Sequence, residues 1–138
     1  MSTVSIDKQN RKTISSIETF FDSLLRGKDK LSENIFFEDL PTTLKKEWKE
    51  FVLVDCGNPQ RDKDSHSAQT VLISLYVMPN AYGKKDVKTL QRLESKLNEL
   101  IEGNTDEHYH TELRGRYSNY NAVNDVFLNI VQINLIIT

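Results

Sequence analysis

The side chains in this sequence that could most readily carry chemistry are two histidines one residue apart, His108 and His110. Alternate residues of a strand share one face, so these imidazoles would lie about 7 Å apart, the first requirement of a two-histidine metal site. A third ligand would have to come from His66, Asp62 or Asp64, and nothing in the spacing demands one. Two histidines on an exposed face are therefore the simpler interpretation.

Other catalytic patterns have less support. The sequence holds no Gly-x-Ser-x-Gly elbow and no glycine-rich phosphate loop. Its single cysteine, Cys56, excludes an internal disulfide framework and a cysteine-based zinc site, and is best interpreted as a small buried hydrophobe. We therefore expect no catalytic residue, no bound metal and no cofactor, and hence a protein that is not an enzyme.

Length and charge bound the remaining possibilities. With 138 residues the chain predicts a single domain over residues 1–138 with a real hydrophobic core. The net charge of −2 gives no global footprint of a nucleic-acid or membrane-surface binder. No apolar run approaches the roughly 20 residues of a membrane span, and the first residues lack an apolar signal core. We expect a soluble protein made in a cytoplasm.

Two amphipathic helices are expected to position these side chains. Apolar residues at three- and four-residue spacing predict a helix over 5–26. Residues 1–12 are expected to fray or to project toward a partner. A leucine stripe predicts a second helix over 84–102 that stops at Gly103. Between them, Pro41 suggests a short helical turn leading straight into a strand.

Four strands complete the expected fold. A continuous apolar run over 51–56 predicts a strand covered on both faces, and a polar loop over 57–69 separates it from a strand over 70–78. Residues 108–117 alternate as a strand with one wet face, and a turn over 118–124 leads to a long final strand over 126–137. The predicted class is α+β, a mostly antiparallel four-stranded sheet packed by two helices in the order α-β-β-α-β-β.

The final strand changes the face on which its apolar residues lie. Val126, Leu128 and Ile130 share one face, whereas the later apolar residues fall on the other. Those later residues are Val131, Ile133, Leu135 and Ile137. Because strand side chains alternate strictly, the change indicates either a bulge or a strand that leaves one packing surface for another.

One charge pattern in the second helix is not explained by helix stability. Lys85, Lys88, Arg92 and Lys96 form a basic stripe roughly opposite the leucines. The first of these lie near the positive end of the helix dipole, where cations are unfavourable. A solvated face is the default interpretation, and the alternative is contact with an acidic surface or a phosphate backbone.

The order of elements resembles a known family. A strand ending in Asp55-Cys56-Gly57-Asn58, a long polar loop, and a strand that passes through Pro79-Asn80-Ala81-Tyr82-Gly83 into a leucine-striped helix are similar to the tail-terminator or tail-completion proteins of tailed bacteriophages. That family also includes neck and connector-ring components. The resemblance implies the same α+β body and no enzymatic activity.

It also implies a location and partners. Members are virion parts that assemble in the host cytoplasm as a ring, commonly six-fold or a multiple, at the head-tail junction. They contact other neck, tail and connector proteins and leave a channel through which DNA passes without sequence-specific binding. No membrane is involved.

The resemblance assigns roles to two sets of residues. The loop that would line the channel or touch an adjoining ring contains Arg61, Asp62, Lys63, Asp64 and His66. The candidate subunit contacts are Glu112, Arg114 and Arg116, whose alternating charges on one exposed strand face could pair with a neighbour's complement.

Two other classes stay open. A small cytoplasmic binding or regulatory module, of adaptor or immunity type, would use the same body as a monomer or dimer. A small metal-dependent hydrolase would act through His108, His110 and Asp62. Defined rings would separate the first class from the second, and metal content would test the third.

Overall fold

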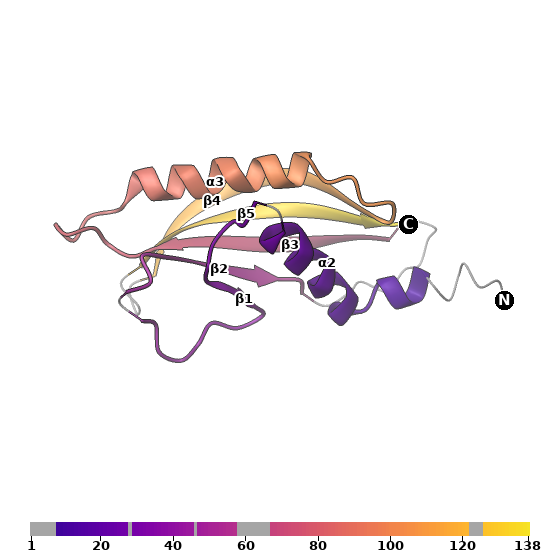
Figure 1. Ribbon diagram of the computed structural model, residues 1–138, viewed down its shortest axis with the longest axis horizontal. Coiled ribbons are helices and arrows are strands. Elements are labelled where there is room, and N and C mark those ends of the chain that lie inside the picture. The colour runs from indigo at the N-terminus through magenta and orange to yellow at the C-terminus, as the bar shows by residue number, and fades with distance from the viewer. Residues whose placement is uncertain (1–7, 28, 46, 58–66, 122–125) are drawn as a thin grey trace.

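The computed structural model describes residues 8–27, 29–45, 47–57, 67–121 and 126–138 (Figure 1). The elements are α2 (Ile14–Arg26), β1 (Ile35–Phe37), β2 (Glu50–Asp55), β3 (Ser67–Val77), α3 (Val87–Glu102), β4 (Tyr109–Asn121) and β5 (Val126–Ile137). They form a mixed five-stranded sheet in the order β1-β2-β3-β5-β4, in which only the β1 and β2 pair is parallel. No described helix is long and apolar enough to cross a membrane.

The α+β class is confirmed, but the expected four antiparallel strands omitted β1. This strand has three residues, too few to show an alternating pattern, and it is defined by its pairing with residues 52–54 of β2. The short helix expected at Pro41 was also wrong. In its place the described chain makes a single turn, in which Trp48 N donates to Lys45 O at 3.0 Å. Pro41 thus lies in a loop that connects two paired strands.

The first helix starts later than the helix predicted over 5–26, at the residue where its apolar pattern begins. Thr13 has extended backbone angles, and its side chain accepts a hydrogen bond from Ser16 N at 3.2 Å. This N-cap starts α2 at Ile14 and separates it from a short helical stretch at residues 8–11. The expected single helix over 5–26 was therefore wrong, and its residues 5–7 lie outside the described residues.

Both helices pack on the same side of the sheet and build the main core. Their fully or almost fully buried residues come from one stripe of each helix and include Ile17, Phe21, Leu25, Leu90, Leu93, Leu97 and Ile101. Opposite them lie alternate residues of β3 and β5, including Ile73 and Ile133, both 0% exposed. α3 ends at Glu102, before the predicted stop residue Gly103.

A second apolar cluster lies on the other side of the sheet. It consists of Phe51, Tyr76, Val126 and Leu128, with side chains from residues 36–48 packed against it. The two clusters explain the change of face in β5, because Val126, Leu128 and Ile130 pack in the second cluster, whereas Val131, Ile133, Leu135 and Ile137 pack in the first, against which Phe127 also packs. β5 pairs with β3 without interruption, so the strand leaves one packing surface for another and contains no bulge in that pairing.

The loop predicted over 57–69 ends earlier than expected, because β3 begins at Ser67. Residues 67–69 already pair with residues 135–137 of β5. Gln69 is 7% exposed, and its side-chain Nε2 donates to Cys56 O at 3.2 Å, so a polar residue is satisfied inside the sheet. Similarly, β4 runs to Asn121, into the turn expected over 118–124.

The bulge predicted as one alternative for β5 occurs instead in its neighbour β4. Leu113 pairs with Ile133 and Gly115 with Gln132, which leaves Arg114 as an extra residue. An extra residue reverses the alternation of the strand beyond it. Glu112 therefore points to the side away from the helices, whereas Arg116 reaches the helix side. The prediction that both share one exposed face was wrong.

Candidate functional site

His108 and His110, which were considered as metal ligands, do not lie on one strand face. His108 precedes β4, and its Nε2 is 3.9 Å from Glu107 Oε2, while His110 Nε2 is 3.4 Å from Thr138 Oγ1. Among the described residues, no three His, Cys, Asp or Glu side chains are grouped to hold a metal ion. The loop residues Arg61, Asp62, Lys63, Asp64 and His66 lie outside the described residues, and their roles stay predictions.

The basic stripe of α3 is divided by ion pairs. Arg92 Nη2 lies 2.5 Å from Glu50 Oε2, and Lys96 Nζ lies 2.9 Å from Asp29 Oδ1. These two cations attach α3 to its neighbours. Lys85 and Lys88 form no ion pair within the described part of the chain, so the available positive charge is concentrated at the start of α3.

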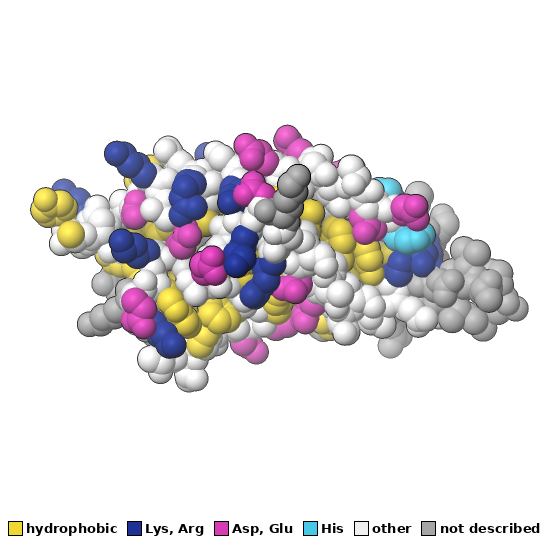
Figure 2. All heavy atoms as spheres, viewed as in Figure 1, with side chains coloured by type: hydrophobic (Ala, Val, Ile, Leu, Met, Phe, Trp, Pro, Cys, Tyr) yellow, Lys and Arg dark blue, Asp and Glu magenta, His cyan; other side chains and the backbone are white. Residues whose placement is uncertain are grey.

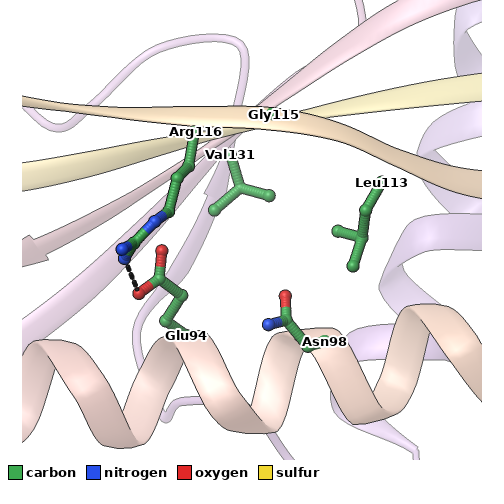
Figure 3. Close-up of a pocket in the computed structure, with 6 residues that line it drawn as sticks. All are labelled: Glu94, Asn98, Leu113, Gly115, Arg116 and Val131. Atoms are coloured by element: carbon green, nitrogen blue, oxygen red, sulfur yellow. Dashed lines mark hydrogen bonds and ion pairs between the residues drawn. The ribbon is translucent and has the colours of Figure 1, made fainter.

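A cavity of about 390 Å³ opens between α3 and the bulged strand β4 (Figure 3). Its lining residues are Glu94, Asn98, Leu113, Gly115, Arg116 and Val131. Arg116 Nη1 donates to Glu94 Oε2 at 2.5 Å, and this hydrogen bond raises the pKa of the guanidinium above its ordinary value. The pair links the edge strand to the helix.

The free oxygen of this carboxylate is unusual. Glu94 Oε1 is buried and has no hydrogen-bond partner among the described residues, although the side chain is 12% exposed. A buried carboxylate oxygen is stabilised by an N–H or O–H donor, and a water molecule in the cavity would be sufficient. No sequence pattern pointed to Glu94, because its partner comes from a strand whose alternation the bulge reverses.

A second hollow lies beside α2 and is acidic. It has a volume of about 320 Å³, and we call it the acidic hollow. The residues that line it are Ser15, Glu18, Thr19, Asp22, Arg26 and Phe37. Arg26 is bound within it, because its Nε lies 2.8 Å from Asp22 Oδ1 and its Nη2 donates to Ile35 O at 2.5 Å. Because Asp22 is paired with Arg26, the carboxylate of the lining that is available to a further cation is that of Glu18.

Three carboxyl groups meet at the edge of this hollow. Glu38 has a left-handed φ of 66°, and its Oε1 accepts a hydrogen bond from Cys56 N at 3.2 Å. Burial raises its pKa to about 7; the Cys56 N–H opposes this shift, and the carboxyls of Glu18 and Asp55 reinforce it. Near neutral pH, Glu38 is thus close to the midpoint of its titration.

Cys56 is buried, as expected from the sequence. The side chain is 1% exposed, and burial, with Glu38 contributing, raises the pKa of its thiol to about 12. The thiol stays protonated near neutral pH, so Cys56 is a core residue and a poor nucleophile.

The sheet side away from the helices carries a patch without charge, which we call the outer patch. It consists of Thr70, Leu72, Gln132, Asn134 and Ile136, on the paired strands β3 and β5, and each of these side chains is exposed or half-buried. Charged or titratable residues flank it, with Asp55 on β2 and His110 and Glu112 on β4. A charge-free centre with a charged rim is the composition typical of protein interfaces.

No family model matches the chain, and no curated protein matches it either. The functional interpretation therefore depends on the described surfaces, of which the outer patch, the acidic hollow and the start of α3 are the most distinctive.

Proposed function

We propose that this chain is a structural subunit of a tailed-phage virion that assembles into a ring at the head-tail junction and leaves a channel for DNA. The observation that supports the proposal is the outer patch. It presents uncharged polar and aliphatic side chains at the centre of the sheet, where a solvent-facing surface would ordinarily carry charges.

The two sides of the sheet differ in role, although they are built from the same strands. Helices α2 and α3 complete the core on one side, so the chain folds without help from the outer patch. A ring subunit needs a body that is stable alone and a second surface that is available to neighbours. The outer patch meets the second requirement, and the division fits the family that the sequence resembles.

A binding or regulatory module of adaptor or immunity type is the second candidate. It would use the same outer patch for a single partner or for a two-fold dimer. The two candidates differ in symmetry, because a dimer closes after one contact whereas a ring requires two different surfaces on every subunit.

The test is the mass of the purified chain by light scattering across a concentration series, with negative-stain images of the same samples. We expect rings of six copies or a multiple. Gln132→Glu with Asn134→Asp adds two charges at almost constant size, and we expect this variant to lose the rings. Gln91→Glu, on the exposed side of α3, is the matched control and should keep them. A dimer that stays constant across the series would overturn the ring and favour the module.

A further inference from the structure

The turn between β3 and α3 carries an exposed tyrosine, and hydrogen bonds hold the backbone of the turn. Asn80 Oδ1 accepts hydrogen bonds from Tyr82 N at 2.9 Å and from Lys84 N at 3.0 Å. Asn80 N donates to Lys84 O, and Gly83 N donates to Asn80 O, both at 2.8 Å. Gly83 has a φ of 72°, which a residue with a side chain rarely adopts. We call residues 80–88 the knob, and it protrudes at one end of the molecule (Figure 1).

The knob carries an apolar tip with a basic rim. Tyr82 is 87% exposed and Val87 is 49% exposed, and they are two of the three large hydrophobic residues that are exposed in the described chain. Lys84, Lys85 and Lys88 surround them and form no ion pair within the described residues. Figure 2 shows a hydrophobic group with basic side chains beside it at this tip.

This arrangement is unfavourable for an isolated chain. Lysines near the positive end of the α3 dipole are repelled by it, and the N-cap Asp86 offsets only part of that effect. A tyrosine side chain has only two torsion angles, so it loses little conformational entropy on binding, which makes this residue type common among the anchors of protein interfaces. The knob therefore has the properties of a preorganised anchor for an acidic surface with an apolar floor.

The acidic hollow supplies these complementary features on the same chain. Phe37 provides an aromatic wall, and Glu18 and Asp22 line the hollow. Glu38 and Asp55 add carboxyl groups next to Glu18. The knob lies at one end of the molecule, whereas α2, which builds the hollow, lies toward the other (Figure 1). Contact between the two within one folded chain is therefore excluded by their positions.

We propose that the knob of one copy docks into the acidic hollow of a second copy, with Tyr82 against Phe37 and the knob lysines against Glu18. The two surfaces differ, so each subunit gives one contact and receives another, and the association continues until a ring closes or an open chain forms. This contact rests on the ring assembly proposed above and identifies surfaces that would hold neighbours together.

A nucleic-acid strand fits the knob less well than a protein. Proteins that bind single strands combine a basic groove with several stacking aromatics, whereas the knob is a convex tip with one aromatic residue. A convex tip requires a concave partner of opposite charge, and the acidic hollow provides one.

Complementary variants test the contact without a known partner. The knob variant combines Tyr82→Ala, Lys84→Glu and Lys88→Glu, and the hollow variant combines Glu18→Gln with Asp22→Asn, which removes the carboxylates without adding cations that the reversed knob could bind. Each variant keeps one half of the contact, so we expect each alone to be monomeric and an equimolar mixture to form a one-to-one dimer by sedimentation velocity. Added salt should weaken that dimer, because the contact is largely electrostatic. Circular dichroism checks that both variants fold.

The control variant changes the same residue types elsewhere. Leu113→Ala with Lys30→Glu removes another exposed hydrophobic residue and reverses another surface lysine, and we expect it to assemble like the original chain. If the mixture contains only monomers at every concentration, the contact is overturned.

The outcomes also separate this contact from the ring proposal. Rings that persist in the knob variant would overturn the contact and leave the ring standing. Open chains of variable length in the original protein, lost in both variants and replaced by the mixed dimer, would support the contact and overturn the ring. Binding of the original chain to phosphatidylserine vesicles or to a poly(dT) oligonucleotide, lost in the knob variant and without a mixed dimer, would show that the partner belongs to a different class.

Discussion

The two sides of the sheet are built from the same strands but differ in what they do. On the helix side, alternate residues of β3 and β5 are 0–2% exposed and form one continuous core with α2 and α3. On the other side, the apolar cluster covers only one end, and the outer patch occupies the rest. The comparison suggests that stability depends mainly on the helix side, and that the outer side is available for contacts with other chains.

The largest expected difference is between two isoleucines of β5. Ile133 is 0% exposed on the helix side, and Ile133→Ala should lower the free energy of unfolding by about 2–5 kcal/mol because it leaves a cavity. The same change at Ile136, which is half-buried on the outer patch, should lower the free energy of unfolding by about 1 kcal/mol, since this side chain buries less apolar area. Urea unfolding measures both, and equal losses would contradict the division of tasks.

A smaller effect is expected from the cap that begins α2. Thr13→Ala removes the side-chain acceptor for Ser16 N, and should lower the free energy of unfolding by about 1 kcal/mol. Thr105→Ala, at an exposed threonine that caps no helix, should change it by less than about 0.5 kcal/mol. Thermal or urea unfolding distinguishes them, and similar values for the two variants would mean that the cap does not support the helix side.

A further effect depends on pH and concerns Glu38, whose pKa is raised from 4.5 to about 7, mainly by burial. The folded state then retains a proton that the unfolded state has lost, so stability from this group is complete below pH 4.5 and falls as the pH rises to about 7. Glu38→Gln should remove that fall. Glu33→Gln, whose native side chain is 80% exposed, is the control and should leave the pH profile unchanged. Unfolding curves between pH 4 and 8 provide the measurement, and parallel profiles for the original chain and Glu38→Gln would exclude this titration.

How much the sequence could predict depended on how local each signal was. The leucine stripe of α3, the stop at Gly103 and the long final strand came from periodicity and composition within short segments, and all were confirmed. The start of α2 was missed because the predicted helix was extended through residues 7–12, which contain no apolar residue, whereas the Thr13 cap begins α2 at Ile14. β1 was missed because three residues show no period.

The candidate sites were less predictable for the same reason. The basic stripe was visible in the sequence, but its neutralisation by Glu50 and Asp29 depends on residues distant along the chain. Tyr82 was noted only within the turn that follows β3, and its 87% exposure depends on where the folded chain places that turn. The interface roles of Glu112, Arg114 and Arg116 stay predictions.

The sequence by itself determined the α+β class, both packing surfaces of β5 and the burial of Cys56, because each follows from the order of apolar and polar residues along the chain. Only the tertiary structure decided which charges are neutralised, where the bulge reverses β4, and that an acidic hollow and a basic knob occupy different places on one subunit. These properties depend on contacts between residues far apart in the chain, and alternation or helical period within a segment carries no information about them.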